Sequence, residues 1–323
     1  MTSAGVGHPG RIVVVGSLNA DLTIYCERLP QPGETVQGNG FAVNPGGKSA
    51  NQAVAAARLG GHVSLVGAVG EDANGNMLEA SVAGAGVDVS HVRNSSEPTG
   101  VAVIAVDARG ENNIIISAGA NGTLSPADVA GAADVLDGAA VVSLCLEVAM
   151  PTVLAAAQAG HGAGATVLLN LSPYADIPAE LAELTDVLLV NAHEAALFLG
   201  PGASVPGADA HASQWDTVRE RFAGRGIRQV LVTLGAHGSV VLDSEAAPGA
   251  QVTYVAPTRV AAVDTTGAGD AFTGAVAVRL AAGDALADAA AFASVAAALA
   301  TTRKGTQAAY PEAADVERRL GTA

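Results

Sequence analysis

The sequence feature that most restricts the fold is an alternation of short apolar runs and helical segments that begins near residue 124. Each run is rich in Val and Leu and follows an Ala-rich or Leu-rich helical segment. The four runs are VVSLCL (141–146), ATVLLNL (165–171), DVLLVN (186–191) and QVLVTLG (229–235). Strands without a polar face belong to a parallel sheet that helices cover on both sides. The pattern therefore predicts an α/β fold of three layers (α/β/α) around a mostly parallel sheet.

Other parts of the chain supply further elements of this kind. RIVVVG (11–16) and HVSLVGAVG (62–70) are typical of buried strands. SVVLD (239–243) and QVTYVA (251–256) are expected to form an antiparallel pair. Helices are expected at residues 49–59, 75–84, 268–282 and 285–302.

Two segments have a different character and predict a small separate sheet. Residues 19–45 alternate polar and apolar side chains, and residues 100–119 are typical of a hairpin that turns at Arg109-Gly110. The sequence contains no internal repeat and no low-complexity linker. We therefore expect one α/β domain over residues 11–310, with residues 19–45 and 100–119 as a β-sheet appendage and residues 1–10 as a flexible tail.

The composition excludes several functional classes. The net charge of −15 leaves no basic stripe to neutralise nucleic-acid phosphates. The two cysteines, Cys26 and Cys145, have no C-x-x-C spacing, which fits a reducing cytoplasm without a disulfide framework. The N-terminus lacks the pattern of a secretory signal, and the apolar run at 285–302 holds Asp288 and predicts a buried helix rather than a membrane span.

The stretch PGGKSANQA (45–53) resembles a phosphate-binding P-loop, but it fails that pattern. In G-x-x-x-x-G-K-[ST] the first glycine would fall at residue 42, which is Ala42, and the preceding stretch is rich in turn residues rather than a buried strand. A simpler alternative is a glycine turn that enters a helix capped by Ser49. The stretch therefore needs an explanation other than an NTPase loop.

The stretch VDTTGAGDAFTGAV (263–276) carries the strongest chemical signal. Its glycines can present backbone N–H groups at the start of an apolar helix, where amides and the helix dipole favour an anion. Asp270 lies in the first turn of that helix. A carboxylate beside an anion site suits a base that takes a proton from a hydroxyl attacking a phosphoryl group, although an Asp that only caps the helix is the alternative.

These two stretches resemble the two signatures of the ribokinase (PfkB) family of sugar kinases. Four further stretches resemble the same family in the same order: GSLNAD (16–21), PGETV (32–36), TLGAHG (233–238) and TRKGTQ (302–307). The resemblance runs from about residue 11 to residue 310. It implies a ribokinase-like fold in which the appendage is a lid, and phosphoryl transfer from MgATP to the O5 hydroxyl of a small sugar, with D-ribose as the expected substrate.

The resemblance also implies the roles of individual residues. Asp270 would be the base, with the amides of Gly267, Ala268 and Gly269 as the anion hole. The sugar would be held by Asn19, Asp21, Gly46, Gly47, Lys48, Asn51, Glu147 and Asp270, so that Lys48 is not a P-loop lysine. A solvated carboxylate at a strand end is the alternative for Glu147.

Nucleotide and cation sites follow from the same resemblance. The ATP-binding residues would be Asn191, Glu194, Thr233, Leu234, Gly235, Gly238, Gly269 and Ser294, and Asn191 and Glu194 would hold Mg²⁺ through water. A monovalent cation, K⁺, would be bound by Asp264, Thr266, Ala300, Arg303, Gly305 and Ala309. The family also implies a homodimer joined through the lids.

Two departures from the family pattern lie near the sugar and leave its identity open. Ser49 replaces a glycine, and Asn44-Pro45 precede the loop where apolar residues are frequent. A kinase of deoxyribose, of a nucleoside or of a hexose therefore stays a rival. A third departure, Ala309 in place of a serine, concerns the cation site, where a backbone carbonyl could still serve. A non-catalytic sensor would be expected to lack Asp270 or the glycines, and a dinucleotide oxidoreductase would need G-x-G-x-x-G, which VVVGSLNAD lacks.

Overall fold

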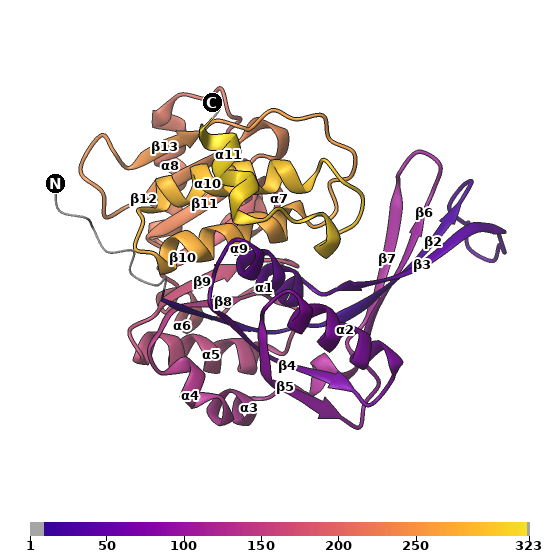
Figure 1. Cartoon of the computed structure of the whole chain (residues 1–323). Coiled ribbons are helices and arrows are strands. Elements are labelled where there is room, and N and C mark those ends of the chain that lie inside the picture. The colour runs from indigo at the N-terminus through magenta and orange to yellow at the C-terminus, as the bar shows by residue number, and fades with distance from the viewer. Residues whose placement is uncertain (1–9, 322–323) are drawn as a thin grey trace.

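A nine-stranded sheet forms the centre of the molecule in the computed structural model, which describes residues 10–321 (Figure 1). Its strand order is β13-β12-β11-β10-β9-β8-β1-β4-β5. Strands β1 to β11 of this sheet pair in parallel, and β12 and β13 pair antiparallel at one edge. The strands are β1 (Arg11–Val15), β4 (Val63–Gly70), β5 (Asp88–Ser95), β8 (Ala139–Leu144), β9 (Thr166–Asn170), β10 (Val187–Asn191), β11 (Gln229–Thr233), β12 (Ser239–Asp243) and β13 (Val252–Val255).

Helices cover both faces of this sheet, as the alternation in the sequence predicts. One face carries α1 (Lys48–Arg58), α2 (Ala73–Gly84), α9 (Ala268–Ala281), α10 (Leu286–Ala300) and α11 (Ala313–Gly321). The other carries α3 (Pro126–Gly131), α4 (Ala133–Leu136), α5 (Met150–Gly162), α6 (Ala179–Glu183), α7 (Ala192–Leu199) and α8 (Ala212–Ala223). The α/β/α prediction is confirmed.

Strand β1 shows why a strand without a polar face is needed here. Ile12 and Val14 lie in the apolar core on one side of the sheet, and Val13 and Val15 lie in the core on the other side. Because successive side chains of a strand point to opposite faces, both faces of β1 must be apolar.

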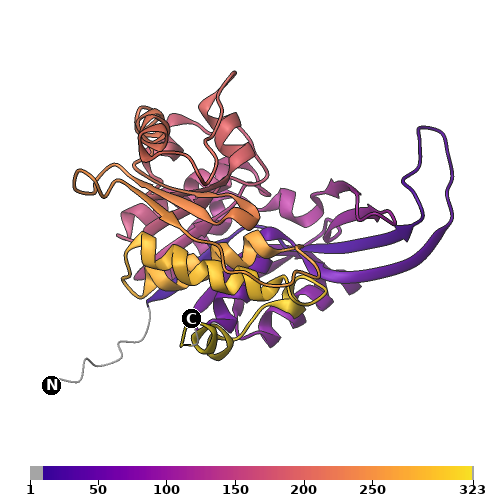
Figure 2. The same ribbon diagram turned by 90° about the horizontal axis from the view of Figure 1, so that it is seen from above.

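A second, four-stranded sheet projects away from the core (Figures 1 and 2). Its order is β3-β2-β6-β7, with β2 (Asn19–Cys26), β3 (Gly38–Gly46), β6 (Gly100–Val106) and β7 (Asn112–Ser117). β2 and β3 pair antiparallel and β6 and β7 form the expected hairpin, while β2 and β6 pair in parallel. The two segments expected as an appendage therefore meet in one sheet, which we call the lid sheet.

Several details differ from the sequence-based expectation. Strand β5 was not expected, because DVSHVRNS is too polar to resemble a buried strand; it lies at the sheet edge, where one side is open. Past residue 310, α11 follows and buries Val316 in the same core as Ile12. Helix α1 begins at Lys48 with Gly47 as its N-cap and no side-chain cap, so the idea of a Ser49 cap is wrong.

The ends of the chain need two further statements. Residues 1–9 of the expected flexible tail lie outside the described residues, as do residues 322–323. Within residues 10–321, no helix is both long enough and apolar enough to cross a bilayer. The apolar run at 285–302 forms α10, which packs in the core against α9.

Candidate active site

The site lies where the strand order changes direction, between β1 and β8. From β1 the chain continues to β4 and β5 on one side, and β8 to β13 extend on the other. The carboxyl ends of strands at such a switch point form a crevice. Here the Ser17 hydroxyl, just past β1, donates to Glu147 Oε2, just past β8, at 2.5 Å. The same oxygen accepts the Lys48 N–H at 2.9 Å, so Glu147 is not simply a solvated carboxylate.

The Gly46-Gly47 pair allows the loop before α1 to lie directly against β2. Gly46 faces Asn19 in the β2–β3 ladder, and a Cβ on Gly46 would collide with the Asp21 carboxylate. Gly47 has φ +90°, and a Cβ on it would lie 2.7 Å from the Asn19 nitrogen. Both positions therefore require glycine. The close approach brings Asn19, Asp21 and Lys48 to one place.

Two side chains that the sequence did not single out fix the turn between β1 and β2 and the Glu147 carboxylate. Asn121 accepts the Leu18 N–H at 3.0 Å and donates to Asn19 Oδ1 at 2.8 Å. This bond orients the Asn19 amide, whose Nδ2 group is then available to donate. In the same way, the Ser17 hydroxyl orients Glu147 by donating a hydrogen bond to its carboxylate.

Ser49 does not face the place where these polar side chains meet. Its side chain is fully buried, and its Oγ lies 3.1 Å from Cys145 Sγ beneath the loop. A Cβ on Gly16 would also collide with the Ser49 hydroxyl, so this side chain fills the space between the loop and β1. Burial raises the pKa of Cys145 to about 12, which keeps the thiol neutral. Ser49 is therefore a packing substitution, and the expectation that it touches substrate identity loses its basis.

Charged groups gather in this crevice and shift one another's pKa. Burial, and then Glu147 and Asp270, raise the pKa of Asp21 to about 7, although Lys48 acts in the opposite sense. Burial lowers the pKa of Lys48, but the Asp270 and Glu147 carboxylates outweigh it and the net shift is upward. The lysine is therefore a permanent cation among three carboxyl groups.

Because the pKa of Asp21 is raised, ionising this side chain lowers the free energy of unfolding at high pH. An asparagine at this position would not ionise and would avoid that loss. A carboxyl group whose pKa rises on folding contributes stability that is complete below about pH 4 and is lost as the pH rises to about 7. We expect the gain in unfolding free energy of Asp21→Asn over the parent to be about 2 kcal/mol larger at pH 8 than at pH 5.5. Urea unfolding at both pH values measures this, with exposed Asp288→Asn as control. An equal gain at both pH values would contradict the account.

Helix α9 begins at the bottom of the same crevice. Its N-cap is Gly267, at φ +74°, and Asp270 lies in its first turn with 8% of its surface exposed. The Tyr310 hydroxyl donates to the Gly267 carbonyl oxygen at 3.2 Å. The Ala268 N–H donates to the Thr265 carbonyl at 3.2 Å. Within residues 10–321, the N–H groups of Gly267, Gly269 and Asp270 have no hydrogen-bond partner, so the helix start offers unpaired amides to an anion.

Side-chain amides connect Asp270 to the loop. Asn51 donates to Asp270 Oδ2 at 3.0 Å and Gln52 donates to Oδ1 at 3.2 Å. Burial raises the pKa of Asp270, while Lys48 and these two amides counteract the rise. The aspartate is thus a buried carboxylate that side chains from α1 hold in place, and it is more than a helix cap.

Four of the predicted nucleotide-binding residues come together at the carboxyl ends of β10 and β11, whereas Glu194, Gly238, Gly269 and Ser294 are not among the residues that line the pocket there. A pocket of about 400 Å³ lies there, and Asn191, Thr233, Leu234 and Gly235 line it together with His193 and His237. Gly238 closes the turn at φ +89°, where a Cβ would collide with the Val255 carbonyl. Ser294 bonds to the Thr258 N–H at 3.2 Å and donates to the Ala256 carbonyl. Its hydroxyl therefore fixes the segment after β13.

Asn191 and Glu194 form a capping box at the start of α7. Asn191 Oδ1 accepts the Glu194 N–H, and Glu194 Oε2 accepts the Asn191 N–H, both at 2.9 Å. This motif explains the N-x-x-E spacing locally. One oxygen of Glu194 and the Asn191 amide nitrogen are not part of the box.

Two chain segments that carry the predicted cation ligands lie side by side. The Val263 and Asp264 N–H groups both donate to the Thr301 carbonyl, at 2.7 and 3.1 Å. The Gly305 and Thr266 N–H groups donate to the Asp264 carboxylate at 3.0 and 2.9 Å. Burial raises the Asp264 pKa, but these bonds outweigh it and hold the pKa below its usual value. The residues present thus fit a monovalent cation, because a permanent carboxylate and the backbone of both segments meet there.

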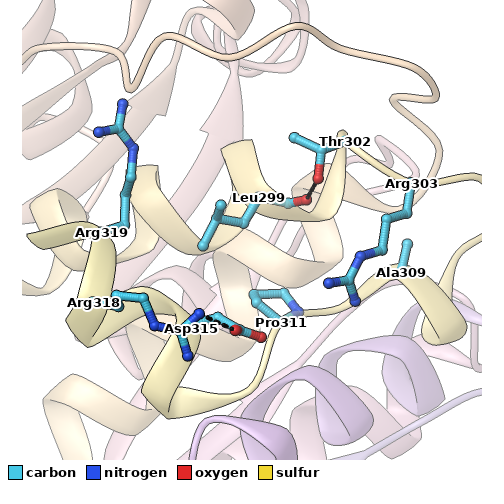
Figure 3. Close-up of a pocket in the computed structure, with 8 residues that line it drawn as sticks. All are labelled: Leu299, Thr302, Arg303, Ala309, Pro311, Asp315, Arg318 and Arg319. Atoms are coloured by element: carbon cyan, nitrogen blue, oxygen red, sulfur yellow. Dashed lines mark hydrogen bonds and ion pairs between the residues drawn. The ribbon is translucent and has the colours of Figure 1, made fainter.

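The Arg303 side chain lies on the wall of a different pocket (Figure 3). That pocket has a volume of about 280 Å³ and lies between the end of α10 and α11; Leu299, Thr302, Ala309, Pro311, Asp315, Arg318 and Arg319 complete its lining. Arg303 can therefore serve the cation loop only through its backbone.

Comparison with known proteins agrees with this geometry. The profile of the pfkB family carbohydrate kinases matches residues 10–313. The chain belongs to the pfkB family of carbohydrate kinases. It is 36% identical to the ribokinase of Schizosaccharomyces pombe over 317 residues, which cover 95% of this chain and 96% of that one. It is 33% identical to the deoxyribokinase of Salmonella typhi, with 93% and 95% covered.

A solved structure supports the same relationship. The structure of Arabidopsis thaliana ribokinase complexed with ribose and ATP has a TM-score of 0.85 and 33% identity, and the match covers 96% of this chain and 98% of that one. The family membership and the fold that the sequence motifs implied are therefore confirmed.

Proposed function

We propose that this chain is an ATP-dependent kinase that transfers the γ-phosphoryl group to the O5 hydroxyl of D-ribose, giving ribose 5-phosphate. The observation that carries the proposal is the bond between Asn51 and Asp270, because it joins the polar loop of the crevice to a buried carboxylate beside unpaired amides. The similarity to ribokinases over nearly the whole chain supports D-ribose as the sugar.

The geometry gives each group a task in this reaction. Asn19, Asp21, Lys48, Asn51 and Glu147 hydrogen-bond the sugar hydroxyls, with the Gly46 and Gly47 backbone close by. Asp270 accepts the O5 proton as that oxygen attacks. The unpaired amides at the start of α9 stabilise the charge on the transferred phosphoryl group.

Nucleotide and metal binding complete the proposal. ATP would bind in the pocket at β10 and β11. Asn191 and Glu194 would hold Mg²⁺ through water, and the ion would supply charge that offsets the phosphates. Asp264 and Thr266, with the backbone of Ala300, Arg303, Gly305 and Ala309, would hold K⁺ beside the loop that precedes α9.

The nearest alternative is a deoxyribokinase, which the relative from Salmonella typhi keeps open. A site built to hydrogen-bond a hydroxyl rejects an analogue that lacks it, since buried polar groups are then left unpaired. We therefore expect kcat/KM for D-ribose to exceed that for 2-deoxy-D-ribose by about 10⁴-fold. A coupled assay of ADP formation with both sugars tests this. A preference for 2-deoxy-D-ribose would mean that the chain is a deoxyribokinase instead.

We further propose that the lid sheet closes over the sugar and joins two copies of the chain. Cross-strand pairing aligns Val43, Val103 and Ile115 in one row across Leu22, with Phe41 beside Ile24 in the next, so these side chains share one face. All of them except Leu22 are exposed, Ile115 at 73% and Phe41 at 65%. An exposed apolar sheet face of this kind is typical of an interface.

The dimer predicts a mass of about twice 31.6 kDa in light scattering. Ile115→Asp combined with Phe41→Asp should give the monomer mass, because burying two carboxylates in an apolar interface is costly. Leu320→Asp, at an exposed apolar position of α11, is the matched control and should stay dimeric. A parent protein that is monomeric at micromolar concentration would refute this part.

The cytoplasm is the proposed location. Cys26 and Cys145 are both free and buried, which suits a reducing compartment.

A further inference from the structure

Asp270 lies at the centre of a buried chain of side-chain hydrogen bonds that extends well beyond the residues expected to touch sugar. On one arm, Ser143 of β8 donates to Gln52 Oε1 at 3.4 Å, and Gln52 donates to Asp270 Oδ1 at 3.2 Å. On the other arm, Ser81 of α2 donates to Gln307 Oε1 at 2.9 Å. Gln307 then donates to Asn51 Oδ1 at 3.0 Å, and Asn51 donates to Asp270 Oδ2 at 3.0 Å.

Every donor in both arms points toward the carboxylate. An ionised carboxylate only accepts hydrogen bonds, so Asn51 and Gln52 must each present the NH₂ group to it. The oxygen of Asn51 then faces Gln307, which must present its own NH₂ group, and the oxygen of Gln307 faces the Ser81 hydroxyl. One anion therefore fixes the orientation of three amides, and these amides in turn are complementary to the anion and not to the protonated acid.

We infer that Gln52 and Gln307 are positioning residues, which hold the Asp270 carboxylate in one orientation and in its ionised form through this chain of one-way hydrogen bonds. The inference rests on the proposed role of Asp270 as the base. Gln52 and Gln307 are 1% and 4% exposed, which leaves them no bulk water to replace a lost partner. Gln307 does not bond to Asp270 itself; it orients Asn51, which donates to Asp270.

The chain meets a specific need of this site. Burial disfavours the charged form of Asp270, and the Glu147 carboxylate disfavours it further. Lys48 favours the charged form, as do the Asn51 and Gln52 amides; Asp21 and the buried Tyr310 hydroxyl also face this group. A base must be ionised to accept a proton, so the amides preserve the form that reacts.

The test replaces each glutamine with leucine, which keeps the size and removes the donor. For Gln307→Leu and Gln52→Leu we expect kcat with D-ribose to fall about tenfold, with the KM for ATP unchanged. The acid limb of the pH profile should move to higher pH by about one unit, because loss of a donor raises the Asp270 pKa. Ser81→Ala should shift the limb in the same direction by less.

A readout without substrate separates this inference from the proposed function. Titration of the Asp270 carboxyl by ¹³C NMR in the free protein should show the same upward displacement in Gln307→Leu, whether or not D-ribose is turned over. Thr152→Val is the matched control: it removes a buried 2.7 Å bond to the Leu124 carbonyl on the other face of the sheet and should leave the titration unchanged.

The inference is overturned if folded Gln307→Leu and Ser81→Ala both titrate as the parent does. It is also overturned if Thr152→Val moves the titration equally, since the effect would then be a general loss of packing. Should Gln307→Leu fail to fold, the milder Ser81→Ala decides the matter in the same titration.

Discussion

Asp270→Asn is expected to lower kcat for D-ribose by about 10³-fold. The side chain keeps its shape, but its NH₂ group would face the amide donor of Asn51 or Gln52, so the loss reports the missing proton acceptor together with one reoriented amide. Asp270 is buried and held by Asn51 and Gln52, which makes a replacement base such as water unable to occupy its place without rearrangement. ADP formation under saturating MgATP and sugar measures the loss.

The matched control for this substitution is Asp288→Asn. Asp288 lies in the first turn of α10 as Asp270 lies in the first turn of α9, but its side chain is exposed whereas Asp270 is buried. It should retain full activity. An Asp270→Asn protein that kept more than about a tenth of the parent kcat would show that another group accepts the proton.

Gly267→Ala is expected to lower kcat by about 10²-fold or more and to lower the unfolding free energy by about 1–2 kcal/mol. The position has φ +74°, which strains any L-residue. The new Cβ would also lie 2.7 Å from Tyr310 Oη and collide with Thr306. The start of α9 must therefore shift, and its unpaired amides move away from the position of the phosphoryl group.

The other end of the same helix supplies the control. Gly283 follows α9 at φ +86°, and a Cβ there meets nothing within 4 Å. Gly283→Ala should thus show a comparable loss of stability from backbone strain with normal kcat. Steady-state kinetics and urea unfolding of both variants separate strain from displacement of the amides. Equal kcat values in the two variants would contradict the anion-hole role.

The fold could be predicted largely because its central strands carry no polar face. Runs such as VLLV in β10 have few alternatives to a parallel sheet covered on both sides. Strand β5 could not be predicted in this way, because it lies at the sheet edge and keeps polar side chains. Helix α11 was not predicted, because it lies past residue 310, where the resemblance ends, and only Val316 of its residues is buried.

The candidate site could be predicted in part, through motifs that carry backbone requirements. Gly46, Gly47 and Gly267 are glycines because neighbouring atoms or a positive φ exclude a side chain. The partners that fix these loops could not be predicted. Gln307 lies 256 positions from Asn51, and only the packing of the turn after α10 against α1 brings the two together. The prediction that Ser49 affects substrate identity has no support, because its side chain points into the core toward Cys145. Sequence alone does not tell which way a side chain points.

The measurement that tests the central claim most directly is ³¹P NMR of the product formed from D-ribose and MgATP with KCl. The account predicts one sugar phosphate whose phosphorus couples to the two C5 protons, formed in equal amount with ADP, and formed about 10³-fold more slowly by Asp270→Asn. ADP formed without a sugar phosphate, or phosphate attached at C1, would contradict the claim that this crevice presents O5 to the phosphoryl group.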